Sequence, residues 1–409
     1  MGARPIAYLA DNHYFWGMNA LLRPIALLTL LYPSVALPQI REAYRPLAAM
    51  LSTRPEREVT EGNRVELIPC GPVLFSRMQE DIMDAEETVH AAYFIFQGDE
   101  TGFLIRSAFQ LKALDGLDVQ YIAEDFTQKA RFIHPMERAG VQVRHHPFFP
   151  LMRRNHQKYL LLDGTVGYAG GVNISHDNLF KWEDTAVRLE GPVVAKMEKV
   201  HAHMWKRKGG KASERVIQTP ASREDGVAVQ CVDEDPTEKS RLNLRAYIWA
   251  LDHAQTYFYA KSPYLKPPEE LIRALVNAAG RGVEVRLVIP AFKDAPSRVI
   301  LPFERAVFED LVRGGVHLHL RTDRFDHSKM FACDDYLSAV GSINLDALSL
   351  VHNFENNLYF YDEAVSVEIR RNIEADWEKS PELTLEQLEA FPVVEKVLRG
   401  PLRAVGMLF

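Results

Sequence analysis

A short pattern of polar residues occurs twice in this 409-residue chain, and it constrains the fold more than any other feature. Counted from a histidine, a lysine follows at +2, an aspartate at +7, a glycine at +14, an asparagine at +17 and a carboxylate at +28. The two copies consist of His156, Lys158, Asp163, Gly170, Asn173 and Asp184, and of His327, Lys329, Asp334, Gly341, Asn344 and Glu355. Chance does not readily give six matching offsets in surroundings that otherwise differ. We therefore interpret the chain as a duplicated unit with one composite site.

The +2 spacing has a structural meaning. Side chains at i and i+2 of an extended chain point to the same side, so each histidine and its lysine are expected to project into one cavity. The apolar runs 159–162 and 330–333 then continue each strand into the core. The glycines leave room for close approach of backbone and ligand, and the asparagines can donate hydrogen bonds.

These residue types suit phosphodiester chemistry. Two histidines can supply a nucleophile and a general acid or base near neutral pH. Two lysines can hold a phosphodiester and stabilise its transition state, and the +28 carboxylates can orient the histidines. Nothing in this set requires a metal, and an ammonium group beside each histidine disfavours a bound cation. We therefore expect neither a metal nor another cofactor.

Two assignments within the pattern have alternatives. Asp163 and Asp334 each follow an apolar run, so their position favours anchoring a turn at the strand end over chemistry. Glu183 directly precedes Asp184 and is an alternative orienting acid. The matching offset of the second copy favours Asp184.

Strand and helix patterns alternate in the same order in two segments. Strands are predicted at 65–69, 89–96, 119–123, 257–260 and 283–289, and helices at 71–87, 104–114, 244–255 and 269–279. Such alternation is typical of βαβ units. The sequence therefore predicts an α/β fold of two similar halves with mixed, largely parallel sheets.

Composition narrows the class of protein. Hydrophobic residues make up 47% and charged residues 25%, which excludes a disordered chain and a polytopic membrane protein. The formal net charge of -7 makes nucleic acid an unlikely partner by charge alone.

We divide the chain into four parts. Residues 1–60 are predicted to form an apolar N-terminal arm, packed on the body or a partner subunit, with insertion into one membrane leaflet as the alternative. A polar, glycine-containing stretch at 206–226 separates the halves, placed at 61–215 and 216–380. Residues 381–409 are predicted to form an amphipathic tail.

The paired motifs, each HxKxxxxD followed by a glycine-rich turn and an asparagine, resemble those of the phospholipase D superfamily. Further phrases resemble bacterial cardiolipin synthases, in particular the short members without N-terminal transmembrane helices; they lie at 100–102, 125–126, 187–192, 262–264, 341–346 and 353–355. The resemblance implies two pseudo-symmetric αβα sandwich halves with one active site between them. It also implies catalytic roles for His156, Lys158, Asp163, His327, Lys329 and Asp334, phosphate binding by Asn173 and Asn344, and histidine orientation by Asp184 and Glu355.

The same resemblance implies an activity. A phosphatidyl group would pass from one phosphatidylglycerol to another through a phosphohistidine on His156, with His327 as acid and base and glycerol released. A phospholipase D-type hydrolase, either a lipase or a nuclease, is the first alternative, and a non-enzymatic lipid-binding module is the second. The implied partners are phospholipids, with peripheral contact at the cytoplasmic face of the bacterial inner membrane, and the oligomeric state is left open.

Candidate contacts with such a membrane are the N-terminal arm, the tail and Phe148–Phe149 before the first motif, with a place in the core wall as the alternative for the two phenylalanines. Arg153 and Arg154 are expected to join Lys158 and Lys329 around an anionic headgroup.

Overall fold

The computed structural model describes residues 40–150, 152–211, 213, 219–290 and 301–390, without the side chains of 301–303. The chain divides into residues 1–38, which lie outside these ranges, and a second unit, so most of the predicted N-terminal arm is not described. The same holds for the tail after residue 390. Everything below concerns the second unit, which begins at Gln39.

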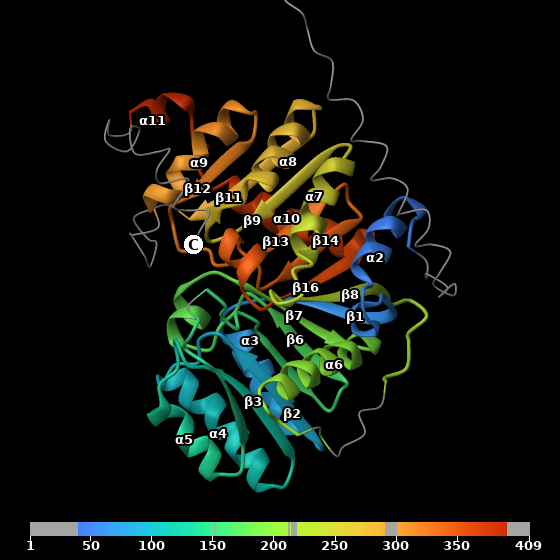
Figure 1. Ribbon diagram of the computed structural model, residues 1–409, viewed down its shortest axis with the longest axis vertical. Coiled ribbons are helices and arrows are strands. Elements are labelled where there is room, and N and C mark those ends of the chain that lie inside the picture. The colour runs from blue at the N-terminus through green and yellow to red at the C-terminus, as the bar shows by residue number, and fades with distance from the viewer. Residues whose placement is uncertain (1–39, 151, 212, 214–218, 291–300, 391–409) are drawn as a thin grey trace, which may run out of the picture. The chain divides into compact units, whose positions relative to one another are not determined.

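A mixed sheet of 14 strands runs through the described part of this unit (Figure 1). The strands of the first half follow one another in the order β1 (Thr60–Pro69), β7 (Thr185–Glu190), β6 (Val166–Gly170), β5 (Tyr159–Leu162), β2 (Thr88–Tyr93), β3 (Asp118–Glu124) and β4 (Gln142–His146). The strands of the second half follow in the order β8 (Val227–Glu234), β16 (Glu355–Tyr361), β14 (Leu337–Gly341), β13 (Met330–Cys333), β9 (Tyr257–Lys261), β11 (Glu284–Pro290) and β12 (His317–Arg321).

The two halves therefore have the same strand order, which confirms the predicted duplication. Their sheets are continuous, because β1 pairs with β8 in antiparallel fashion, with Thr60 opposite Val229 and Asn63 opposite Val227. This central pair lies on the approximate symmetry axis of the strand order.

The prediction that the sheets are largely parallel is wrong. Parallel pairing in the large sheet is confined to β2–β3–β4 in the first half and β9–β11–β12 in the second. The inner strands pair in antiparallel fashion, since short turns connect β5 to β6 and β13 to β14 as hairpins. A hairpin needs only a few connecting residues, whereas parallel neighbours need a crossover.

Helices cover both faces of the sheet (Figure 1). One face of the first half carries α3 (Pro72–Asp84), α4 (Glu100–Leu114) and α5 (Ala130–Arg138), and one face of the second half carries α2 (Arg45–Leu51), α7 (Leu242–His253), α8 (Glu269–Gly280) and α9 (Leu301–Arg313). The other face is covered by α6 (Pro192–Arg207) and α10 (Glu363–Trp377). The short helix α11 (Leu385–Glu389) begins the predicted tail.

Strand alternation explains this layering. In β5, Leu160 and Leu162 pack in the cluster under α3 to α5, whereas Tyr159 and Leu161 pack in the cluster under α6. That second cluster also contains Val365 and other residues of α10 and of the second half's strands, so the halves share one hydrophobic core. The α/β class with two αβα halves is confirmed.

Shorter elements complete the described chain. They are the 3-10 turns η1 (Glu42–Tyr44) and η2 (Pro55–Arg57), the π-helical turns η3 (Asp177–Lys181) and η5 (Leu348–His352), and the two-stranded sheet of β10 (Leu265–Lys266) and β15 (Leu345–Asp346). Among the described helices, none is long and apolar enough to span a bilayer.

Candidate active site

The two motif histidines lie in extended segments that lead into β5 and β13. His156 and Lys158 precede β5, which begins at Tyr159, so the pair lies just before the strand rather than within it. Both histidines are buried, with exposed fractions of 7% and 6%. In each half the lysine ammonium donates a hydrogen bond to the backbone oxygen of its own histidine, at 2.5 Å for Lys158 and His156.

Each motif histidine contacts a carboxylate of the opposite half. Nδ1 of His156 lies 2.9 Å from both carboxylate oxygens of Glu355, and Nδ1 of His327 lies 2.8 Å from Oδ2 of Asp184. Backbone hydrogen bonds also join the halves here: the His156 amide donates to the Phe354 oxygen at 2.9 Å, and the His327 amide donates to the Glu183 oxygen at 2.6 Å. The +28 residues thus join the predicted site, but each serves the histidine of the other copy.

The pKa values in the site reflect its burial. Burial lowers the pKa of His156 to about 4, despite the opposing effect of Glu355, and lowers the pKa of His327 well below its ordinary value. Burial raises the pKa of Asp184 to about 7 and lowers the pKa of Lys329 to about 8. With Nδ1 of each histidine held by a carboxylate, Nε2 remains for chemistry.

The glycine-rich turns bring these carboxylates close to the backbone. A Cβ atom at Gly171 would lie 2.5 Å from Oδ1 of Asp184, so any larger residue would displace the acid. In the second half Ser342 takes the equivalent place, and its hydroxyl donates a hydrogen bond to Glu355 at 2.5 Å. The sequence showed this serine, but its contact with the acid could not be read from spacing.

The two asparagines of the motifs differ in their bonding. Oδ1 of Asn173 accepts a hydrogen bond from the Ile95 amide at 3.0 Å, and its Nδ2 donates to Asn178 at 3.2 Å. Asn173 and Lys158 also line a small cavity in the first half. Asn344 is equally buried, but its Oδ1 has no partner among the described residues.

Asp163 and Asp334 lie at the far ends of β5 and β13, away from the histidines. The carboxylate of Asp163 accepts hydrogen bonds from the amides of residues 86–88 at 2.8–2.9 Å. Asp334 accepts from the amides of 255–257 in the same way, at 2.7–3.0 Å. Both residues have a positive φ, of 53° and 49°. This geometry matches the anchoring alternative, because each aspartate fixes the start of β2 or β9.

A network of buried charges supports the second histidine, and the sequence analysis missed it. Lys261 lies 3.0 Å from Asp326, next to His327 in the chain, and Arg321 lies 2.7 Å from Asp376. Arg321 also binds Glu183 at 2.8 Å, so the alternative acid is used in this network and not on a histidine. The only available signal was charged residues at the ends of apolar strands.

The first half uses a different arrangement around its motif. Arg154 is buried and its guanidinium lies 3.1 Å from Glu124, while Arg153 is exposed. The expectation that both arginines face a headgroup is therefore wrong for Arg154, whose donors are used inside the protein. Aromatic rings flank the histidines, with ring centroids 4.8 Å apart for Phe94 and His156 and 5.4 Å apart for Trp182 and His327.

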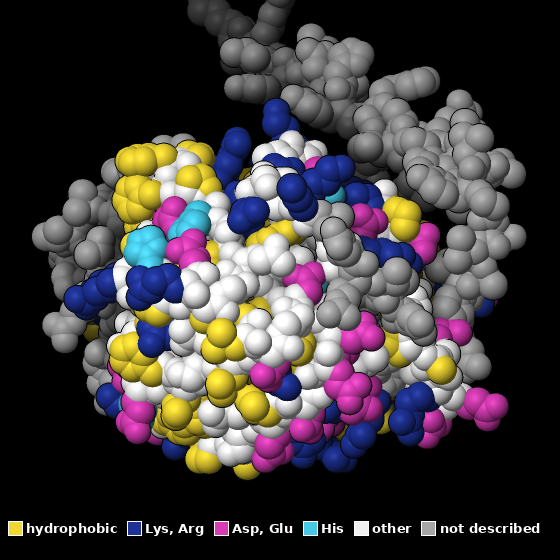
Figure 2. Space-filling view, turned by 90° about the horizontal axis from the view of Figure 1, so that it is seen from below, with side chains coloured by type: hydrophobic (Ala, Val, Ile, Leu, Met, Phe, Trp, Pro, Cys, Tyr) yellow, Lys and Arg dark blue, Asp and Glu magenta, His cyan; other side chains and the backbone are white. Residues whose placement is uncertain are grey.

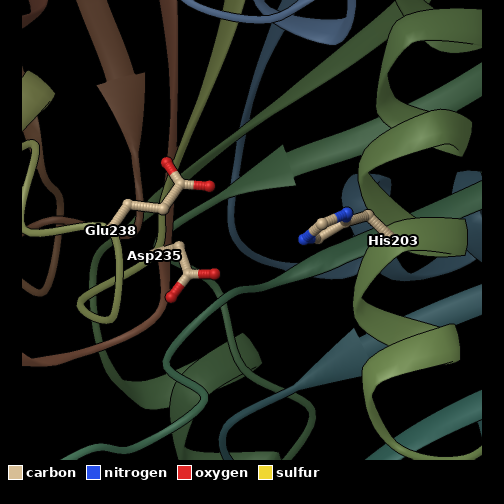
Figure 3. Close-up of side chains that lie close together, drawn as sticks. All are labelled: His203, Asp235 and Glu238. Atoms are coloured by element: carbon tan, nitrogen blue, oxygen red, sulfur yellow. The ribbon is translucent and has the colours of Figure 1, made fainter.

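A separate group of metal-type ligands lies outside this site (Figure 3). His203 projects from α6 toward Asp235 and Glu238, and their ligand atoms lie within 4.8 Å of one another. Arginines already bind the carboxylates: Arg207 lies 2.6 Å from Asp235, and Arg54 lies 2.8 Å from Glu238. Because these cations neutralise the group, we assign no metal to it.

Comparison with known proteins places this geometry in a family. The family model described as "Cardiolipin synthase, PLD-like domain" matches residues 78–205 and 247–377, one match for each half. The chain belongs to this family. It is an enzyme of the phospholipase D superfamily, as the paired motifs predicted.

Curated relatives extend over most of the chain. It is 30% identical over 379 residues to cardiolipin synthase 1 of Staphylococcus epidermidis, covering 87% of this chain and 76% of the relative. It is also 30% identical over 348 residues to the minor cardiolipin synthase ClsB of Bacillus subtilis, covering 79% and 83%.

Solved structures share the fold at low identity. The phosphatidylserine synthase of Haemophilus influenzae matches with a TM-score of 0.66 at 14% identity, covering 84% of this chain and 95% of that chain. A polyphosphate kinase from Porphyromonas gingivalis matches with a TM-score of 0.57, also at 14% identity, covering 83% and 53%.

The anchoring geometry of Asp163 predicts a loss of stability. Asp163→Ala removes an acceptor from three backbone amides, so we expect the free energy of unfolding to fall by about 2–3 kcal/mol, measured by chemical denaturation. Asp163→Asn keeps one acceptor oxygen and tolerates positive φ, so it should lose less. Normal stability with abolished turnover in Asp163→Ala would contradict an anchoring role.

The buried lysine predicts a pH dependence. The pH profile of kcat/KM reports groups of the free enzyme. We expect the charged form of Lys329 to attract the substrate's phosphate, so kcat/KM should fall as pH rises through about 8. Lys329→Arg keeps its charge, so any activity it retains should persist to higher pH. An alkaline limb that does not move in this variant would contradict the assignment.

Proposed function

We propose that this protein is a cardiolipin synthase that transfers a phosphatidyl group from one phosphatidylglycerol to another. The observation that carries the proposal is the composite site, in which two histidines, two lysines and two carboxylates from both halves converge. The names of the relatives support the same activity.

In the first proposed step, Nε2 of His156 attacks phosphorus and the bond from phosphorus to the glycerol oxygen breaks. His327 starts this step protonated and gives its proton to the departing glycerol, and the phosphatidyl group remains on His156 as a phosphohistidine. Glu355 supports this role, because its carboxylate faces Nδ1 and stabilises the positive charge that develops on the ring. Although burial raises the pKa of Glu355, His156, Lys158 and Ser342 together lower it, which favours the ionised form.

In the second step, His327 removes a proton from a glycerol hydroxyl of another phosphatidylglycerol. That oxygen attacks phosphorus, the bond from phosphorus to His156 breaks, and cardiolipin forms. Lys158 and Lys329 provide the positive charge that stabilises the phosphoryl oxygens in both steps. All proton transfers use side chains of this chain, and no metal or other cofactor takes part.

We also propose that the enzyme binds the membrane surface peripherally, on the cytoplasmic side of a bacterial inner membrane. Phe126, Phe148 and Phe149, here called the aromatic patch, are 51%, 41% and 69% exposed, so a place in the core wall is wrong for Phe148–Phe149. The ring centroids of Phe126 and Phe148 lie 5.6 Å apart, and those of Phe148 and Phe149 lie 4.8 Å apart. On the face seen in Figure 2, hydrophobic side chains gather at one edge beside histidine and basic side chains.

The aromatic patch contacts the segment that carries the first motif histidine. The guanidinium of Arg154, two residues before His156, lies 5.6 Å from the centre of the Phe126 ring. Arg153 on the same loop is exposed and can meet anionic headgroups. Insertion of the patch would therefore bring the interface next to the first motif.

Product analysis tests the proposed activity. Labelled phosphatidylglycerol in vesicles should yield cardiolipin and free glycerol, whereas phosphatidic acid would indicate a hydrolase and no product would indicate a binding module. His156→Ala and His327→Ala should each lower turnover by at least a thousandfold in protein that remains folded, since each removes one reacting group. Turnover of His327→Ala at the wild-type rate would overturn the composite site.

Vesicle flotation tests the aromatic patch. Phe148→Ser/Phe149→Ser should weaken binding to phosphatidylglycerol vesicles about tenfold, because two exposed rings lose their burial in the interface. Val73→Ser/Leu114→Ser changes two residues that are each 70% exposed outside this loop and serves as the control. Equal flotation of both variants would contradict a docking role for the patch.

A further inference from the structure

The approximate symmetry of the two halves allows equivalent positions to be compared. The separation of His156 from His327 is 171 residues, and the same offset relates Asn173 to Asn344. It also relates the π-helical turns η3 and η5. The halves share this framework but differ in the polar residues beside the asparagine.

In the first half, these polar residues form a closed network. Asn173 accepts from the Ile95 amide and donates to Asn178, as described above. Nδ2 of Asn178 in turn donates to the hydroxyl of Ser175 at 2.7 Å. These side chains of the first half thus form hydrogen bonds with one another, which leaves few polar atoms available to bind a ligand.

In the second half, the equivalent residues leave buried polar atoms without partners. Asp346 replaces Ser175 and Ser349 replaces Asn178. Oδ1 of Asn344 and the hydroxyl of Ser349 have no hydrogen-bond partner among the described residues, although the residues are only 5% and 1% exposed. Buried polar atoms are nearly always paired, so these two indicate a missing ligand or water.

The backbone explains why the second network is open. In the first half Phe96 forms a β-bridge with Ile174, and in the second half Leu265 pairs with Leu345 at the equivalent place. The residue before each, Ile95 or Tyr264, is therefore also equivalent. The Tyr264 amide donates to the hydroxyl of Ser262 at 3.4 Å and not to Asn344. Oδ1 of Asn344 therefore lacks the donor that its counterpart has.

Charged groups surround the open network. Lys266 lies opposite Asp346 in the two-stranded sheet, and Oδ1 of Asp346 accepts a hydrogen bond from the Ser349 amide at 2.7 Å. Burial raises the pKa of Asp346, and it raises the pKa of the nearby Glu304 to about 7. Asp346 is one of the carboxylates that oppose the burial-induced fall in the pKa of Lys329.

We propose that Asn344, Asp346 and Ser349, with Lys266 beside them, bind the hydroxyl groups of a small polyol such as a glycerol headgroup. A vicinal diol both donates and accepts hydrogen bonds, so it can satisfy the unpartnered amide oxygen of Asn344 and hydroxyl of Ser349 together. These residues, here called the polyol pocket, belong to the half that carries His327, the proposed acid and base for the alcohol. The inference rests on the proposed function and names the part of the substrate that this half recognises.

A half-swap variant tests the pocket. Asp346→Ser/Ser349→Asn installs the residues of the first half, which should close the network while the protein keeps its unfolding temperature. Saturation-transfer NMR compares binding of free glycerol with binding of 1-propanol, which has a single hydroxyl, and needs no turnover. Wild-type protein should bind glycerol more strongly than 1-propanol. In the variant, the ratio of the two affinities should fall at least fivefold. Asn178→Ser, at the equivalent position of the first half, is the matched control and should keep it.

A second arm uses the lipid-borne headgroup. With phosphatidylglycerol vesicles, the variant should form fewer cardiolipin molecules per phosphatidic acid than wild type, by about tenfold. Equal glycerol preference in variant and wild type, or none in wild type, would overturn the pocket and leave only a water site. If the double variant unfolds, Ser349→Asn alone is subject to the same outcomes. If wild-type protein binds glycerol but forms no product from phosphatidylglycerol, the proposed function is overturned instead.

Discussion

The hydrogen bonds from each motif histidine to a carboxylate of the opposite half are the contacts on which the rest of the site depends. They join His156 to Glu355 and His327 to Asp184, all of them buried. A buried carboxylate without a partner is costly, so neither half can complete its site alone. The continuous sheet across β1 and β8 and the shared core under α6 and α10 keep the halves in register for these bonds.

The same exchange controls the charge of the site. Lys158 and Lys329 are both buried, and burial lowers the pKa of each. Their positive charge is opposed by Asp184 and Glu355, which explains how two ammonium groups are tolerated so close together. A phosphodiester adds a negative charge to this set, so its binding relieves the repulsion between the lysines. These described side chains therefore favour an anionic ligand.

The repeated offsets made the duplication and the converging histidines and lysines predictable from the sequence, and the alternation of strand and helix patterns made the α/β class predictable. They could not show which acid serves which histidine, since offsets are the same whether the carboxylates stay in their own half or cross. Parallel pairing was overestimated because strand-helix alternation describes only the outer strands of each half. Ser342, Lys261 and Arg321 were missed because their contacts depend on the tertiary packing of distant strands.

The boundary between the halves near residue 215 stays a prediction, as does the N-terminal arm, since residues 214–218 and 1–39 lie outside the described ranges. The structure gives more detail on the differences between the halves. The serine at 342 and the open network beside Asn344 belong to the second half alone. One fold has thus been used twice, with different hydrogen bonding around the two motifs.

The exchange of carboxylates is tested most directly by nitrogen NMR of the histidine rings. In protein labelled with ¹⁵N-histidine, Asp184→Asn should change the Nδ1 and Nε2 signals of His327, because it removes the carboxylate 2.8 Å from Nδ1. The signals of His156, which faces Glu355, should stay as in wild type. A change confined to His156, the histidine in the same half as Asp184, would contradict the account.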